Sequence, residues 1–135
     1  MAAIDTNILV RFLVEDDVAQ CALAQRLIAA ALNAGDTLYV PITVALELEW
    51  VLRSNFGFSK STVVQTLHAL LSSTELSFES EPALELALML FEDAQNTKAD
   101  FSDCLHIALA HKAEQAPLWT FDKAAAKIEG ARLLS

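Results

Sequence analysis

The chain has 135 residues, of which 54% are hydrophobic, and a net charge of −9. A chain of this length can bury one core, so we expect residues 1–135 to form a single domain. The negative charge argues against binding nucleic acid through a broad basic face, although a bound divalent cation can reverse the sign of an acidic pocket. No apolar run approaches the roughly 20 residues that span a bilayer, and Asp5 would interrupt a signal peptide. We therefore expect a cytoplasmic protein with no membrane partner.

The first half of the chain alternates short apolar strands with helical patterns. Helix stops and caps come from Gly35, from Asp16 or Asp17, from Thr43 and from Ser59. The expected elements are a buried strand over 2–5, a helical turn over 8–14, a helix over 18–32, a strand over 38–42, a helix from 43 to about 53 and a helix from 59 to about 71.

The second half continues this alternation. The expected elements are a weak strand over 76–78, a helix that starts at 80–82, a helix that starts at 100–103 and passes 110, a strand over 118–121 and a last strand near 131–134. Short apolar strands separated by helices predict an α/β fold with a mostly parallel sheet covered on both faces. Cys21 and Cys104 lie in apolar helical stretches and are expected to be buried thiols.

Carboxylates recur where such a fold brings chain segments together. Asp5 and Asp122 end strands, Glu47 lies early in a helix after a strand, and Asp100 and Asp103 open a helix. Ligands bind outside the carboxyl ends of the strands in an open α/β sheet, so these acids could converge on one pocket. Each also has a simpler role: Asp100 and Asp122 as helix caps, Asp103 as a first-turn charge, Asp5 as part of a turn and Glu47 as a surface residue.

A cluster of these acids needs a counter-charge. Two carboxylates about 5 Å apart repel by roughly 3 kcal/mol at an effective dielectric near 20, so four ionised carboxylates would cost about 10 to 20 kcal/mol. A domain stable by roughly 5 to 15 kcal/mol cannot sustain that cost. Either some carboxyls are protonated or a hard cation such as Mg²⁺ or Mn²⁺ lies among their oxygens. One or two such ions can position water and neutralise a phosphodiester.

Four segments, taken together, resemble the PIN-domain ribonucleases, and in particular the VapC type of toxin from toxin–antitoxin pairs. The segments are 5–13, 41–52, 99–108 and 119–122. The resemblance runs from one end of the chain to the other. It implies a three-layer α/β/α PIN-like fold, cleavage of RNA that depends on Mg²⁺ or Mn²⁺, a homodimer, and a cognate antitoxin that occupies the acidic groove. RNA is then the substrate, with tRNA as one candidate.

Position by position, the resemblance implies a role for each acid. Asp5, Glu47, Asp103 and Asp122 are the four expected catalytic acids, and Asp100 is an additional one. Asp5, Asp100, Asp103 and Asp122 are expected to hold the metal, and spacing leaves open whether Asp100 or Asp103 lies closer to it. Thr6, Asn7 and Thr120 are expected to orient the carboxylates. Glu49 lies about 200° around the helix from Glu47, so it is not expected to be a ligand.

Five cations lie near the expected site in the sequence, and each is either an RNA contact or a solvated surface charge: Arg11, Arg53, Lys60, Lys98 and Lys123.

Two other classes of protein, one enzymatic and one signalling, fit the sequence less well. A dehalogenase-type phosphatase needs a second Asp where Asn7 stands, and a receiver domain needs adjacent acids before its phospho-acceptor strand. The stronger rival is a PIN-fold protein that binds RNA or a partner with little turnover.

Overall fold

The structure is a computed structural model that describes residues 2–94 and 98–135. Contacts between Cα atoms divide the chain into two compact units, one that ends at Glu79 and one that begins at Ser80. Every strand pair is parallel, and six α-helices lie in the described residues. The predicted α/β class with parallel strands is therefore confirmed.

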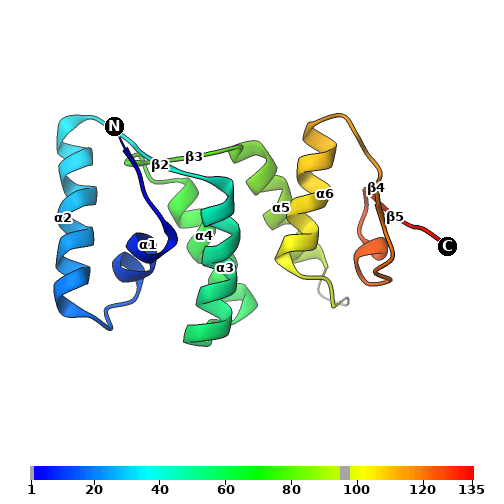
Figure 1. The fold of residues 1–135 in the computed structure, drawn as a ribbon, viewed down its shortest axis with the longest axis horizontal. Helices are drawn as coiled ribbons and strands as arrows, with labels where there is room; N and C mark the ends of the chain where they lie inside the picture. The colour runs from blue at the N-terminus through cyan, green and yellow to red at the C-terminus, as the bar shows by residue number, and fades with distance from the viewer. Residues whose placement is uncertain (1, 95–97) are drawn as a thin grey trace. The chain divides into compact units, whose positions relative to one another are not determined.

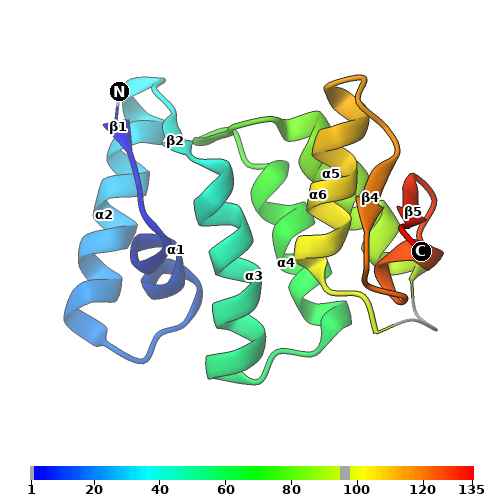
Figure 2. The ribbon, with the colours of Figure 1, turned by 45° about the vertical axis from the view of Figure 1, so that its right-hand side comes forward.

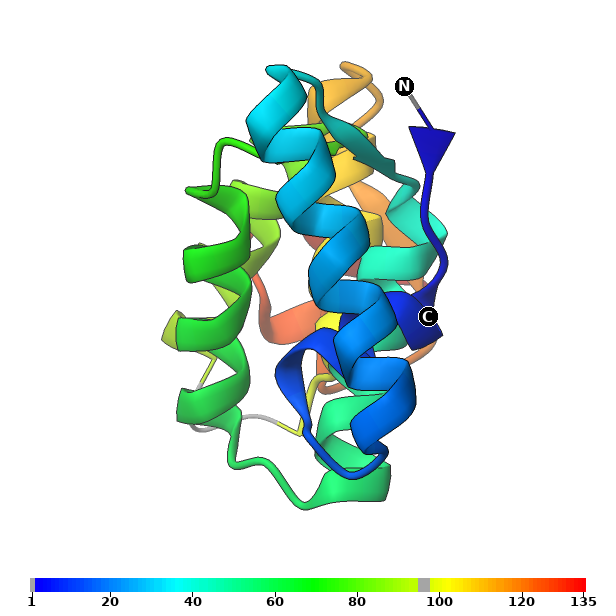
Figure 3. The same cartoon turned by 90° about the vertical axis from the view of Figure 1, so that its left-hand side faces the viewer.

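The first unit contains a three-stranded sheet and four helices (Figure 1). Its elements are β1 (Ala2–Ala3), α1 (Thr6–Leu13), α2 (Val18–Ala34), β2 (Leu38–Val40), α3 (Ile42–Phe56), α4 (Lys60–Leu71) and β3 (Leu76–Phe78). The strand order is β1-β2-β3, and Leu38 of β2 is in register with Ala2 and with Leu76. Helix α1 packs beside α2, as Figure 3 shows from the side of α2, and it also packs against α3.

The second unit contains two helices and a pair of strands (Figure 2). Its elements are α5 (Glu81–Asp93), α6 (Phe101–Lys112), β4 (Leu118–Thr120), the short 3₁₀ helix η1 (Ala125–Lys127) and β5 (Ala131–Leu133). Helices α5 and α6 pack together, and the rings of Phe91 and Phe101 meet edge to face with centroids 5.6 Å apart. Gly130, at the start of β5, has a φ of +99°, and a Cβ there would lie 2.9 Å from Cγ2 of Ile107. Only glycine fits this position without strain.

Several helix ends follow the local signals in the sequence. The side chain of Asp17 accepts a hydrogen bond from the backbone N of Gln20 at 3.0 Å, and Ser59 caps α4 in the same way. Helix α2 ends at Gly35, whose φ of 70° places it in the left-handed region. These caps satisfy backbone groups that a helix end leaves unpaired, so they confirm the predicted boundaries.

Some predicted boundaries were wrong. The first strand has two residues instead of four, and both are exposed instead of buried. Helix α3 begins at Ile42 and not after a Thr43 cap, and it continues to Phe56 instead of ending near Arg53. Pro41 occupies its cap position and offers no side-chain acceptor. A distant acid takes that role, since Oε1 of Glu79 accepts from the backbone N of Ile42 at 2.8 Å.

Helix α2 has an unexpected distribution of side chains. Its buried residues are Cys21, Ala24, Ile28 and Ala31. The larger Val18, Leu27 and Leu32, which helical spacing assigned to the same apolar face, are exposed at 83%, 40% and 53%. Three of the four buried side chains are small, whereas these three larger apolar side chains remain exposed.

Both cysteines are buried, as predicted. No helix in residues 2–94 or 98–135 has the length and apolar character needed to cross a bilayer.

Candidate active site

Asp5 lies at the start of α1 and acts as its N-cap. Its Oδ1 accepts a hydrogen bond from the backbone N of Ile8 at 3.3 Å, and the carboxylate is exposed. The sequence predicted this acid at the end of a strand, and the structure places it two residues after β1. The exposed N–H groups at a helix N-terminus stabilise a carboxylate there. The hydrogen bond to Oδ1 therefore fixes one oxygen of Asp5.

Thr6 links this helix start to α3. It is the first residue of α1 and is buried, at 5% exposure. Its Oγ1 donates a hydrogen bond to Oε1 of Glu47, which is exposed on α3. The structure therefore brings Glu47 to the residue that follows Asp5, although 41 positions of sequence separate the two partners of this bond.

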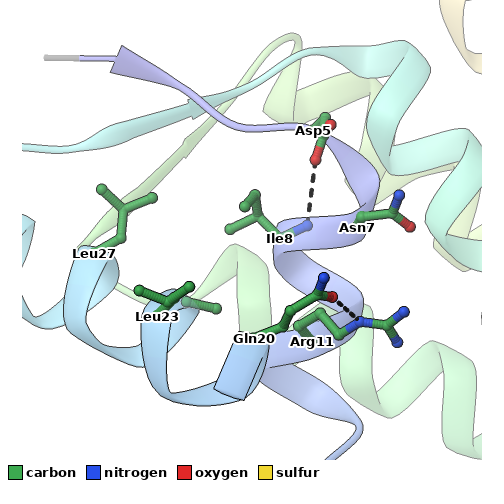
Figure 4. Close-up of a pocket in the computed structure, with 8 residues that line it drawn as sticks. Asp5, Asn7, Ile8, Arg11, Gln20, Leu23 and Leu27 are labelled. Atoms are coloured by element: carbon green, nitrogen blue, oxygen red, sulfur yellow. Dashed lines mark hydrogen bonds between the residues drawn. The ribbon is translucent and has the colours of Figure 1, made fainter. Parts of the chain in front are cut away.

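Asn7, the third polar residue of this segment, is exposed and lines a pocket beside Asp5 (Figure 4). The pocket is lined by Asp5, by Asn7, Ile8 and Arg11 of α1, and by Gln20, Leu23, Ala24 and Leu27 of α2. The hydrogen bond from Thr6 to Glu47 supports the expected role of Thr6 in orienting a carboxylate. Asn7 lines the pocket, and Figure 4 shows its amide pointing away from α2.

Asp100 and Asp103 lie together at the start of α6 in the second unit. They form a capping box, in which Oδ2 of Asp103 accepts from the backbone N of Asp100 at 3.0 Å. Asp100 is exposed and Asp103 is half-buried. The sequence allowed for Asp100 as a helix cap, and the capping box agrees with that role. The two acids place carboxylate oxygens at the N-terminus of α6.

Asp122 follows β4 and is held by its local turn. Its Oδ1 accepts from the backbone N of Ala124 at 2.8 Å and of Ala125 at 3.2 Å. Its own backbone N donates to Oγ1 of Thr120 at 3.0 Å. The sequence allowed for Asp122 as a helix cap, and the structure has the short 3₁₀ helix η1 after it. Thr120 contacts the backbone of the acid it was expected to orient.

Four predicted acids share one arrangement. In Asp5, Glu47, Asp103 and Asp122, one carboxylate oxygen accepts a hydrogen bond from the protein. Within residues 2–94 and 98–135, the second oxygen of each accepts none. A carboxylate that is fixed through one oxygen and open at the other is suited to bind a hard cation.

The acids do not form a preassembled metal cluster in the part of the chain that the structure describes. No group of three or more His, Cys, Asp or Glu side chains there is close enough to hold a metal ion. Asp5 and Glu47 belong to the first unit, whereas Asp100, Asp103 and Asp122 belong to the second.

Two of the five predicted RNA-binding cations already pair with acids. Arg11 contacts Asp16 through Nη1 at 2.8 Å, and Arg53 contacts Glu49 through Nε at 2.9 Å. Glu49 is 2% exposed, which fits its predicted orientation away from Glu47. Lys60 begins α4 and is half-buried, while Lys98 and Lys123 are exposed.

Sequence reasoning missed the residues of α2 that face Asp5, namely Gln20, Leu23 and Leu27. The sequence signal for them was a pair of leucines four residues apart, a spacing that usually indicates residues of the hydrophobic core.

The contact of Tyr39 with Glu79 was also not predicted from the sequence. Partial burial of the phenol, the negative charge of Glu79 and a hydrogen bond to that carboxylate raise the pKa of Tyr39 above its usual 10.0.

Comparison with known families identifies the class of the chain. Residues 2–131 match the model of the PIN domain family, so this chain belongs to that family. The predicted PIN-like α/β/α fold is thereby confirmed. PIN domains are generally nucleases, commonly ribonucleases that depend on divalent metal ions. No curated protein matches the chain.

Proposed function

We propose that this chain is an endoribonuclease that depends on Mg²⁺ or Mn²⁺ and acts as the toxin of a toxin–antitoxin pair. The observation that carries the proposal is the shared state of Asp5, Glu47, Asp103 and Asp122, each fixed through one oxygen and open at the other. The two compact units work as one nuclease domain in this proposal. Asp5, Asp100, Asp103 and Asp122 hold the metal.

The donor set fits the expected ion, because it consists of carboxylate oxygens, which hard divalent cations prefer. When bound, the metal lowers the pKa of a water molecule and neutralises charge on the phosphodiester. The protein's part is to keep the carboxylates oriented. Backbone N–H groups do this for Asp5, Asp103 and Asp122, and the Thr6 hydroxyl does it for Glu47.

Glu47 is the candidate general base of this site. A carboxylate that accepts one hydrogen bond from a buried hydroxyl keeps a defined orientation, and its other oxygen can accept a proton from an attacking water.

Among the five predicted RNA-binding cations, Lys98 and Lys123 are best suited to contact the RNA backbone. Both are exposed, whereas Arg11 and Arg53 already pair with acids. Specific RNA recognition targets single-stranded segments and loops, so a tRNA loop is one candidate substrate.

The test is incubation of the purified chain with total RNA and with a tRNA pool, in Mg²⁺, in Mn²⁺ and in chelator. We expect discrete fragments only with metal. The Asp5→Asn variant should lose at least 100-fold in rate and remain folded, because asparagine is as good an N-cap as aspartate. Asp36→Asn, which changes an exposed acid in the loop before β2, is the matched control and should retain activity.

If the chain binds RNA but does not cleave it with either metal ion, the proposed nuclease activity is refuted and the rival hypothesis of an RNA-binding module is supported.

The toxin role has a separate test. Expression in a bacterial cytoplasm should arrest growth with the wild-type chain and not with Asp5→Asn, and coexpression of a cognate antitoxin should relieve the arrest. Sedimentation of the purified chain tests the proposed homodimer.

A further inference from the structure

A pocket between α1 and α2 lies directly beside Asp5 (Figure 4). It has a volume of about 400 Å³ and lies wholly within the first unit. This volume is in the range of about 300 to 1,000 Å³ that is typical of small-ligand sites. Asp5 itself forms part of its wall, so a group held in the pocket lies next to the carboxylate proposed to bind the metal.

The apolar wall of this pocket consists of Ile8, Leu23, Ala24 and Leu27. Leu23 is 59% exposed and Leu27 is 40% exposed, and Figure 4 shows both side chains on the α2 side of the pocket, with Ile8 opposite them on α1. Exposed leucines that line a concave surface gain free energy when a ligand covers them. The wall is therefore suited to contact the apolar face of a ligand.

Two polar side chains of the pocket, Arg11 and Gln20, are held in position by hydrogen bonds. Nε of Arg11 donates to Oε1 of Gln20 at 2.6 Å, and Nη1 of Arg11 contacts both carboxylate oxygens of Asp16 at 2.8 and 3.1 Å. Because the Gln20 oxygen faces the guanidinium, its NH₂ group is left to donate elsewhere. Asn7 also contributes to the lining of the pocket, and its amide points away from α2 (Figure 4). Apart from the Asp5 carboxylate, the polar lining is thus close to neutral, since Asp16 neutralises the charge of Arg11.

We propose that this pocket binds one nucleobase of the RNA substrate, an assignment that rests on the proposed nuclease function. A nucleobase combines a flat apolar face with a hydrogen-bonding edge, which matches the leucine wall and the amide NH₂ of Gln20. Its sugar and phosphate would lead towards Asp5. The pocket then selects which nucleotide stands beside the cleaved bond.

The test uses a short single-stranded RNA that contains a mapped cleavage site. Abasic nucleotides replace the bases near that site one at a time, and each RNA is assayed with the wild-type chain and with Leu23→Ala. One abasic position should lower the wild-type kcat/KM about tenfold or more, because the apolar contacts and hydrogen bonds of the bound base are lost. Leu23→Ala should lower kcat/KM on the intact RNA and have little further effect on that abasic RNA.

Two matched variants control for effects on α2 itself. Leu32→Ala removes an exposed leucine outside the pocket, and Gln25→Ala removes an exposed glutamine outside it. Both should match the wild type on every RNA, whereas Gln20→Ala should follow Leu23→Ala. All these positions are exposed, so the variants should fold.

Other outcomes separate the two proposals. If RNA is cleaved but the effects of Leu23→Ala and of every abasic position simply multiply, the base pocket is refuted and the nuclease stands. Loss of binding to a protein inhibitor by Leu23→Ala, with RNA cleavage unchanged, would assign the pocket to an apolar peptide side chain instead. If the chain neither cleaves these RNAs nor binds them in fluorescence anisotropy, both proposals fail.

Discussion

The hydrogen bond from Thr6 to Glu47 offers a sharp test of how the site is built. Thr6→Val removes the hydroxyl and keeps the β-branched shape at a buried position, so packing changes little. A hydrogen bond to a charged group contributes about 1.5 to 3 kcal/mol, and 1.4 kcal/mol is a tenfold change. Loss of an orienting partner typically costs 10- to 100-fold in activity or metal affinity.

We therefore expect Thr6→Val to lower kcat/KM for RNA cleavage by about 10- to 100-fold. Thr6→Ser keeps the hydroxyl and should restore most of the activity. Chemical denaturation of each variant gives the free energy of unfolding and separates misorientation of Glu47 from loss of structure. The dependence of the rate on Mn²⁺ concentration shows whether the variant loses metal affinity or catalytic rate.

A double-mutant cycle makes this reasoning refutable. On a Glu47→Gln background, Thr6→Val should have little additional effect on kcat/KM, because the charged partner is already absent. A Thr6→Val variant with wild-type kcat/KM and metal dependence would show that Thr6 does not position Glu47. Equal losses on both backgrounds would assign the effect of Thr6 to the stability of α1.

Two further predictions concern stability and titration. Gly130→Ala should destabilise the protein by about 2 to 4 kcal/mol in chemical denaturation, because it combines a positive φ with a Cβ 2.9 Å from Ile107. Gly35→Ala, at a φ of +70° with nothing within 4 Å of a Cβ, should cost only about 1 to 2 kcal/mol, and equal losses in the two variants would refute the steric argument. Tyr39 is the only tyrosine in the sequence, so ultraviolet titration of tyrosinate reports its pKa alone, with an expected midpoint above 10.0 that Glu79→Gln lowers. Because folding raises this pKa, the stabilising contribution is present below the unfolded pKa and is lost as the pH rises through the folded value. A midpoint that does not respond to Glu79→Gln would show that the carboxylate does not act on the phenol.

The local signals of the sequence were sufficient for most element positions. Asp17 and Ser59 cap their helices and Gly35 ends α2, because a cap depends on side chains within three or four residues of the backbone group they satisfy. The capping box of Asp100 and Asp103 follows from the same spacing. The order of apolar strands and helices likewise indicated parallel pairing.

The candidate acids were also predicted from the sequence, since each ends a strand, opens a helix or lies early in one. Their hydrogen bonds to backbone N–H groups in Asp5, Asp103 and Asp122 are local, with partners two or three residues away. The sequence therefore determined which carboxylates are presented and how one oxygen of each of these three is fixed.

Only the tertiary structure decided the contacts between distant segments. Thr6 meets Glu47 across 41 positions, and Glu79 caps α3 across 37 positions, where Pro41 left no local acceptor. It also decided that Leu23 and Leu27 face outward beside Asp5, because their exposure depends on how α1 and α2 pack. Periodicity groups apolar residues on a face of a helix, but the side chains of the neighbouring helix determine how much of that face is buried.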